Sequence, residues 1–124
     1  MSKRAKPIVR VVDDELEIRT ILSKFLDRLG YAVEEAATGA EALTKALATR
    51  PDAILLDQKL PDFDGYEAYQ HLAQFGLRVP TALMSGYPGV DQVARLDGLC
   101  HFLPKPIVFD NLGAFMSRLM TTKP

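Results

Sequence analysis

The sequence predicts an α/β fold built on a parallel sheet, and two features of its pattern support this prediction. Short apolar runs alternate along the chain with longer segments in which apolar residues recur every three or four positions. One run, residues 53–56, is apolar throughout, which is typical of a strand buried on both faces of a sheet. Repeated strand–helix units with right-handed crossovers favour a parallel sheet that carries helices on both faces.

The first half of the chain supplies two of these units. Residues 8–12 form a compact β-branched run, which predicts a strand. The apolar spacing over 18–29 predicts an amphipathic helix, and Gly30 is suited to end it. A weaker strand is expected at 31–35, followed by a helix at about 40–49.

The second half continues the alternation. Strands are predicted at 53–56, 79–84 and 99–103, and helices at about 66–75, 90–96 and 109–120. We expect the helix at 90–96 to be short, shifted or mobile, because Pro88 and Gly89 are poor residues for its start.

Length, charge and cysteine content exclude several classes of protein. The 124 residues suit a single domain, 1–124, with loose termini at 1–6 and 121–124. Basic residues cluster at the start and leave the rest of the chain acidic, which argues against direct nucleic-acid binding. A lone cysteine, Cys100, allows no internal disulfide and favours a cytoplasmic location. No apolar run approaches the roughly 20 residues of a membrane span.

Polar residues stand where the predicted strands end. These residues are Asp13 and Asp14, Asp57, Ser85 and Lys105. In the flavodoxin-like strand order 2-1-3-4-5 they would meet at one edge of the sheet. Clustered carboxylates raise one another's pKa or bind a cation, and oxygen ligands of this kind favour Mg²⁺. Asp13 and Asp14 are also suited to cap the helix that follows them.

The residues at this edge are compatible with phosphoryl transfer to a carboxylate. The first glycine of the chain is Gly30, so no glycine-rich phosphate loop follows the first strand. A carboxylate can itself accept a phosphoryl group. A metal ion and Lys105 would then neutralise the charge of the transferred group.

Five short motifs, in this order and spacing, resemble the receiver domain of response regulators in two-component signalling. They are the pair Asp13-Asp14, the run 54–57, the Leu60-Pro61 and Asp64-Gly65 steps that follow it, the Met84-Ser85-Gly86 step, and the segment 102–106. The resemblance covers nearly the whole chain.

The resemblance implies a role for each matching residue. Asp57 corresponds to the phosphoacceptor, and Asp13 and Asp14 to the acidic pair that holds Mg²⁺ with Asp57 and the backbone carbonyl of Lys59. Lys105 would contact the phosphoryl oxygens. The side chain of Lys59 departs from the family, in which a neutral residue is commoner there. We expect it to weaken Mg²⁺ binding or to alter the lifetime of the phosphorylated state.

The resemblance also implies a switch. Ser85 would move toward the phosphoryl group and Phe102 would swing inward, which would bias a surface made by the fourth helix, fifth strand and fifth helix. A cis bond is expected between Lys105 and Pro106.

The function implied is a phosphorylation-dependent signalling module rather than an enzyme. Its partners would be a sensor histidine kinase or a histidine phosphotransfer protein of a phosphorelay, and a downstream protein that the sequence does not identify. The chain would be a monomer or a weak homodimer, and either a stand-alone regulator or the receiver of a larger protein.

Two alternative functions stay open. One is an aspartyl-phosphate-forming phosphatase or phosphotransferase, although Lys59 stands where such enzymes commonly need a second acid. The other is a degenerate receiver that binds partners without phosphorylation.

Overall fold

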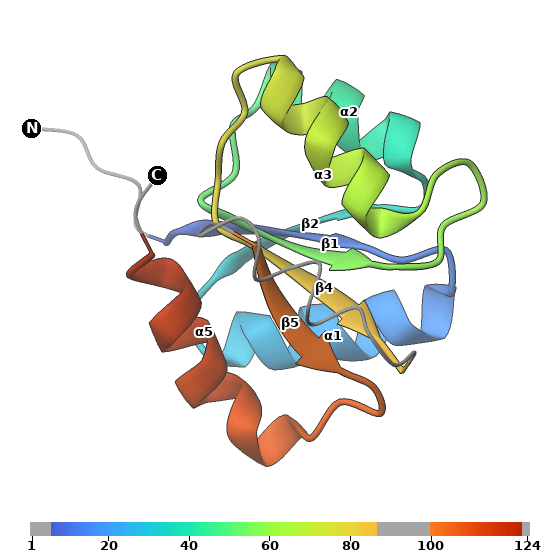
Figure 1. The fold of residues 1–124 in the computed structure, drawn as a ribbon. Coiled ribbons are helices and arrows are strands. Elements are labelled where there is room, and N and C mark those ends of the chain that lie inside the picture. Colours follow the sequence, from blue (N-terminus) through green and yellow to red (C-terminus); the bar gives the residue numbers. More distant parts are fainter. Residues whose placement is uncertain (1–5, 87–99, 123–124) are drawn as a thin grey trace, which may run out of the picture.

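The computed structural model describes residues 6–86 and 100–122, and it confirms the predicted α/β architecture (Figure 1). Its centre is a five-stranded sheet in which every pair of neighbouring strands is parallel. The order β2-β1-β3-β4-β5 is the one expected from the sequence. The strands are β1 (Ile8–Val12), β2 (Ala32–Ala36), β3 (Ala53–Asp57), β4 (Thr81–Ser85) and β5 (Cys100–Pro104).

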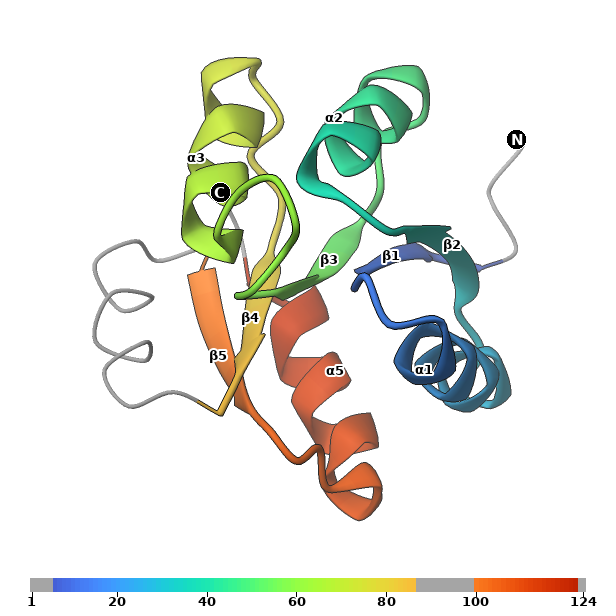
Figure 2. The ribbon, with the colours of Figure 1, turned by 90° about the vertical axis from the view of Figure 1, so that its right-hand side faces the viewer.

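Helices cover both faces of this sheet. They are α1 (Leu16–Arg28), α2 (Gly39–Ala48), α3 (Gly65–Gln74) and α5 (Leu112–Met120), the last preceded by the 3₁₀ turn η1 (Phe109–Asn111). Figures 1 and 2 show α2 and α3 on one face and α1 and α5 on the other. The helix predicted at 90–96 lies outside the described residues. None of the described helices is long and apolar enough to cross a membrane.

Some element boundaries differ from those predicted. β4 begins at Thr81 rather than 79, because Pro80 has no N–H to donate to a neighbouring strand. The last helix starts as the 3₁₀ turn η1 and becomes α-helical only at Leu112. Thr122, the last residue that the structure describes, contacts β5: its hydroxyl lies 2.9 Å from Nε2 of His101.

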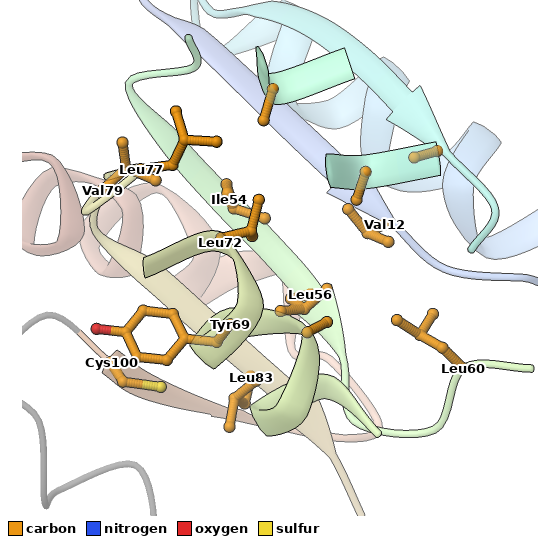
Figure 3. Close-up of a cluster of buried hydrophobic side chains, with 14 residues drawn as sticks. Val12, Ile54, Leu56, Leu60, Tyr69, Leu72, Leu77, Val79, Leu83 and Cys100 are labelled. Carbon is orange, nitrogen blue, oxygen red and sulfur yellow. The ribbon is translucent and has the colours of Figure 1, made fainter. Parts of the chain in front are cut away.

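Two apolar clusters hold the helices onto the sheet. Side chains alternate between the faces of a strand, so each strand contributes to both clusters. The cluster beneath α2 and α3 contains, among others, Val12, Ile54, Leu56, Tyr69, Leu72 and Leu83 (Figure 3). The cluster beneath α1 and α5 contains, among others, Val9, Val11, Leu22, Leu26, Leu55, Met84 and Met116. The unbroken apolar run of β3 is buried along its whole length, as predicted.

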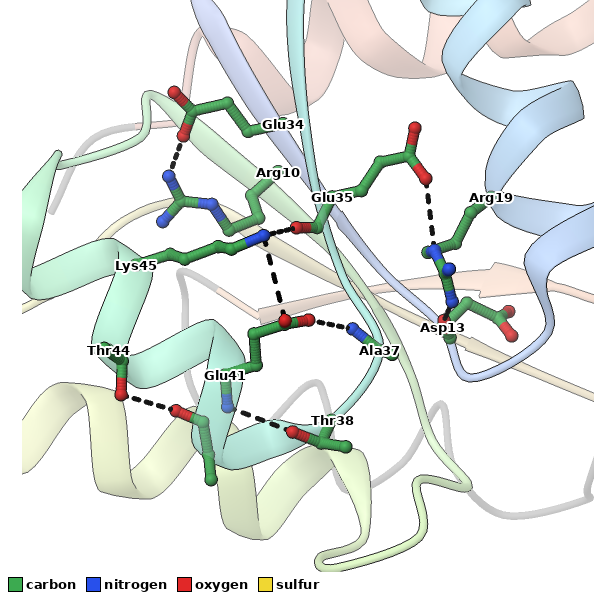
Figure 4. Close-up of polar contacts among 11 residues, drawn as sticks. Arg10, Asp13, Arg19, Glu34, Glu35, Ala37, Thr38, Glu41, Thr44 and Lys45 are labelled. Atoms are coloured by element: carbon green, nitrogen blue, oxygen red, sulfur yellow. Dashed lines mark hydrogen bonds and ion pairs between the residues drawn. The ribbon is translucent and has the colours of Figure 1, made fainter.

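The charged side chain of Arg10 on β1 is buried beside apolar side chains. Only 1% of Arg10 is exposed, and its guanidinium pairs with the carboxylate of Glu34, its neighbour in register on β2 (Figure 4). Its Nη2 also donates to the carbonyl of Thr49, at 3.3 Å. Among the described residues, Nε and Nη1 of Arg10 have no hydrogen-bond partner. The ion pair with Glu34 is therefore the main compensation for burying this charge.

Glu34→Ala is expected to lower the free energy of unfolding by about 1–3 kcal/mol, because it leaves a buried cation without its counter-charge. Arg10→Met removes the charge itself and is expected to cost less. Urea unfolding measures the stability of both variants. The control is Glu35→Ala on the same strand, whose partner Arg19 is more exposed. A loss in Glu35→Ala as large as in Glu34→Ala would contradict the prediction.

Candidate functional site

The pairing of β1 with β3 brings the first acidic residues together. The two strands are parallel neighbours, and Val12 is in register with Leu56. The next residues, Asp13 and Asp57, therefore leave the same edge of the sheet side by side. Together with Asp14 they form a group in which one carboxylate oxygen from each residue lies within 4.8 Å of the others. The convergence predicted from the strand ends is confirmed for these three side chains.

Asp13 and Asp14 occupy different environments. Asp13 is fully buried, and its Oδ1 accepts a hydrogen bond of 2.9 Å from the backbone N–H of Glu15. Its carbonyl accepts a hydrogen bond of 2.7 Å from Nη1 of Arg19 on α1 (Figure 4). Asp14 is exposed. The N-cap of α1 is Glu15, so neither aspartate occupies the capping position that was the alternative for this pair.

Lys105 supplies positive charge to the cluster from the other side. Its Nζ donates to Oδ1 of Asp57 at 3.1 Å and to Oδ2 of Asp13 at 3.4 Å. Its backbone N–H donates to the carbonyl of Ser85 at 2.9 Å, which continues the pairing of β4 with β5 beyond Pro104. The Lys105–Pro106 peptide bond is cis, as expected.

The titration of Asp57 and Lys105 reflects this arrangement. Burial raises the pKa of Asp57, and the negative charge of Asp13 raises it further, against the opposing effect of Lys105. Burial by itself lowers the pKa of Lys105, but the hydrogen bonds and charges of Asp57 and Asp13 outweigh burial, and the pKa of Lys105 is raised. Lys105 is therefore charged at neutral pH, yet it does not fully compensate the carboxylates. The remaining negative charge favours a cation with oxygen ligands.

The cluster opens into a cavity of about 640 Å³. Its lining includes Asp14, Asp57, Lys59, Ser85 and Lys105, so the structure gathers at one place most of the residues predicted for the site. Ser85 ends β4 and is buried. The side chain of Lys59 is exposed, and its backbone N–H lies 3.4 Å from Oδ1 of Asp57.

Phe102, the other residue predicted for a switch, lies on β5. It is in register with Leu83 of β4. Its ring is partly buried against the cluster beneath α2 and α3. Phe102 is not among the described residues that line the cavity of the site, and β4 and β5 connect the two.

Sequence patterns did not identify the roles of two residues that shape the site, Gly65 and Arg19. A Cβ added to Gly65 would lie 2.6 Å from the carbonyl oxygen of Asp57, so glycine is required where α3 begins. The Asp64-Gly65 step signalled a turn but not this close approach. Arg19, which bonds to the carbonyl of Asp13, gave no sequence signal because that contact depends on how α1 is oriented on the sheet.

Comparison with known proteins agrees with this geometry. The family model described as the response regulator receiver domain matches residues 9–116. Response regulator MprA of Mycobacterium avium is 39% identical in an alignment 119 residues long, which covers 94% of this chain and 52% of that protein. The chain thus spans about half the length of this curated relative.

Solved structures of receiver domains and chemotaxis proteins are also similar to this chain. Chemotaxis protein CheY4 of Vibrio cholerae superposes with a TM-score of 0.83 at 32% identity, covering 93% of this chain and 99% of that one. The receiver domain of the hybrid histidine kinase CckA superposes with a TM-score of 0.77 at 28% identity, covering 92% and 99%. By its fold, its acidic site and these similarities, the chain belongs to the response regulator receiver domain family.

Proposed function

We propose that this domain accepts a phosphoryl group on Asp57 from a phosphohistidine, in a reaction that depends on Mg²⁺. The observation that carries the proposal is the environment of the Asp57 carboxylate. It lies at the carboxyl end of β3, 3.1 Å from Lys105 and within 4.8 Å of the carboxylates of Asp13 and Asp14, beside an open cavity. The donor would be a sensor histidine kinase or a histidine phosphotransfer protein, in line with the family.

The transfer is a single displacement at phosphorus. A carboxylate oxygen of Asp57 forms the new P–O bond while the P–N bond of the phosphohistidine breaks, and the imidazole nitrogen keeps the electron pair of that bond. Lys105 lies where it can hold the negative charge of the phosphoryl oxygens, which is the main demand of this chemistry. The raised pKa of Lys105 keeps that charge in place at neutral pH.

Oxygen donors that fit Mg²⁺ surround the same carboxylate. Asp13, Asp14 and Asp57 would hold the ion, together with the backbone carbonyl of Lys59 and water. When bound, the ion supplies positive charge that offsets both the carboxylates and the incoming phosphoryl group. Three carboxylates this close, with one lysine as compensation, form a donor set that suits a hard divalent cation.

The phosphorylated state would be read through Ser85 and Phe102. The buried hydroxyl of Ser85 lines the cavity beside Asp57, within the region that new phosphoryl oxygens would enter. Phe102 is only partly buried, so it can gain apolar contacts by moving inward. A movement of this pair would change the face around β5 and α5 and thereby the affinity for a downstream protein.

An enzyme acting on phosphomonoesters is a weaker explanation of the same site. Such enzymes commonly place a second acid two residues after the nucleophile to protonate the leaving group. Lys59 stands at that position and lines the cavity. We therefore propose a signalling module whose only chemistry is its own phosphorylation and dephosphorylation.

Incubation with acetyl phosphate and Mg²⁺ should add the mass of one phosphoryl group to the chain, and Asp57→Asn should abolish the gain. Intact-protein mass spectrometry measures it, with a chelator replacing Mg²⁺ as the metal control. The matched control is Asp52→Asn, because Asp52 precedes the other end of β3. Equal labelling of Asp57→Asn and the unmodified chain would refute the assignment of the phosphoacceptor.

Without divalent cations, Asp57→Asn is expected to unfold at a higher urea concentration than the unmodified chain at pH 7. The pKa of Asp57 is raised by burial and by Asp13, so its ionised form is destabilised in the folded state. The folded state then binds more protons than the unfolded chain, and stability falls as pH rises through the folded pKa of Asp57. The difference between the two proteins should shrink as pH falls toward the usual pKa of aspartate. A constant difference across that pH range would contradict this explanation.

Lys59→Ala is expected to tighten Mg²⁺ binding by about 1.5- to 5-fold, because it removes an exposed positive charge from the rim of the acidic cavity. The lifetime of the phosphorylated chain should change as well. Backbone amide NMR signals followed during Mg²⁺ titration measure the affinity, and mass spectrometry after removal of donor measures the lifetime. Lys24→Ala, which removes an exposed charge from α1, should change neither quantity. If Lys59→Ala changed neither the Mg²⁺ affinity nor the lifetime, the proposed effect of the Lys59 charge would be refuted.

A further inference from the structure

The loop between β3 and α3, residues 58–64, is tied to the start of α2 by one carboxylate. Asp62 accepts hydrogen bonds from the backbone N–H groups of Gly39 and Ala40, each at 2.9 Å. These are the first two residues of α2, whose N–H groups have no partner within the helix. The hydrogen bonds outweigh the effect of burial and lower the pKa of Asp62. The carboxylate therefore stays charged and bound to α2 at neutral pH.

The next residue, Phe63, fits closely against the same helix end. A Cβ added to Gly39 would lie 2.7 Å from Cδ2 of Phe63 and 3.3 Å from Oδ1 of Asp62. The ring of Phe63 also packs against His71 of α3, with 4.8 Å between the ring centres. The tip of the loop, Asp62 and Phe63, thus contacts α2 through hydrogen bonds and apolar packing, and α3 through the ring of Phe63.

The loop is closed on itself, so its tip and its base are connected. Lys59 and Asp64 form an antiparallel bridge, and the N–H of Leu60 donates to the carbonyl of Phe63 at 3.3 Å. The N–H of Gly65 donates to the carbonyl of Gln58 at 2.8 Å. A displacement of the tip would consequently reach the backbone of Lys59, beside Asp57.

We propose that Asp62 is a positioning residue, which holds the β3–α3 loop against α2 and thereby sets the backbone of Lys59 beside the phosphoacceptor. The role in metal binding rests on the proposed function, since Lys59 would offer its carbonyl to Mg²⁺. The role in ordering the loop does not depend on it. Asp62 is not a member of the acidic cluster, and it acts on the site only through the loop.

The chain provides a matched control for this role. Thr38 is the N-cap of α2, and its hydroxyl accepts a hydrogen bond of 3.0 Å from the N–H of Glu41. Thr38→Ala removes a cap from the same helix end but leaves the bonds of Asp62 in place. A purely structural effect of uncapping α2 would appear in both variants, whereas a loss of loop positioning would appear only when Asp62 is changed.

The experiment compares Asp62→Ala, Asp62→Asn and Thr38→Ala with the unmodified chain. Urea midpoints should fall in both alanine variants. Asp62→Ala, unlike Thr38→Ala, should speed hydrogen exchange at the amides of Leu60 and Gly65. It should also weaken Mg²⁺ binding, by roughly tenfold as for other residues that orient a metal ligand. Labelling by acetyl phosphate should also be slower in Asp62→Ala, because the transfer depends on Mg²⁺. Asp62→Asn keeps one acceptor oxygen, so its exchange rates and Mg²⁺ affinity should lie between those of Asp62→Ala and the unmodified chain.

Each outcome has a distinct meaning. Unchanged exchange at Leu60 and Gly65 in Asp62→Ala would overturn the positioning role whether or not Mg²⁺ binds. Equal Mg²⁺ affinities in Asp62→Ala and Thr38→Ala would overturn the role of Asp62 in metal binding. Absence of Asp57-dependent labelling in the unmodified chain would instead refute the proposed function, and the exchange measurement would still decide the role of Asp62.

Discussion

The register between β1 and β3 is the constraint on which the site depends. Val12 lies opposite Leu56, so Asp13 and Asp57 leave the sheet at the same level. A slip of one residue would turn every side chain of β1 to the other face, because side chains alternate along a strand. Arg10 would then point away from the face on which it now pairs with Glu34. Such a slip would break the ion pair of the buried Arg10 with Glu34, so this pair favours the register that assembles the acidic cluster.

The cluster itself opposes folding, and groups around it reduce that cost. Two buried carboxylates, those of Asp13 and Asp57, lie together with Asp14, and the raised pKa of Asp57 reports the resulting repulsion and desolvation. Lys105 contributes charge from beyond β5, and Arg19 bonds to the carbonyl of Asp13. The compensation is incomplete, and the remaining negative charge favours a cation with oxygen ligands at this site. Functional sites commonly retain such locally unfavourable interactions.

Much of this arrangement could be predicted from local sequence patterns. The apolar run ending at Asp57, the β-branched run before Asp13 and the segment around Lys105 each carry a local signal, and strand order then places them at one edge. Element boundaries were less predictable. β4 starts after Pro80 and the last helix starts as a 3₁₀ turn, because missing donors and local turns override apolar spacing there. The contacts of Asp62 were not predictable, since its partners on α2 lie more than twenty residues earlier in the chain.

Sequence patterns alone predict the alternation of strands and helices, the acids, hydroxyl and lysine at the strand ends, and the resemblance to receiver domains. These features follow from periodicity and short motifs, which depend only on residues close together along the chain. The packed fold, in contrast, reveals that Asp13 is buried while Asp14 is exposed, that Gly65 must lie against Asp57, and how the β3–α3 loop is anchored. Burial and hydrogen bonding at these positions depend on how separate helices pack on the sheet, and no local pattern encodes that packing.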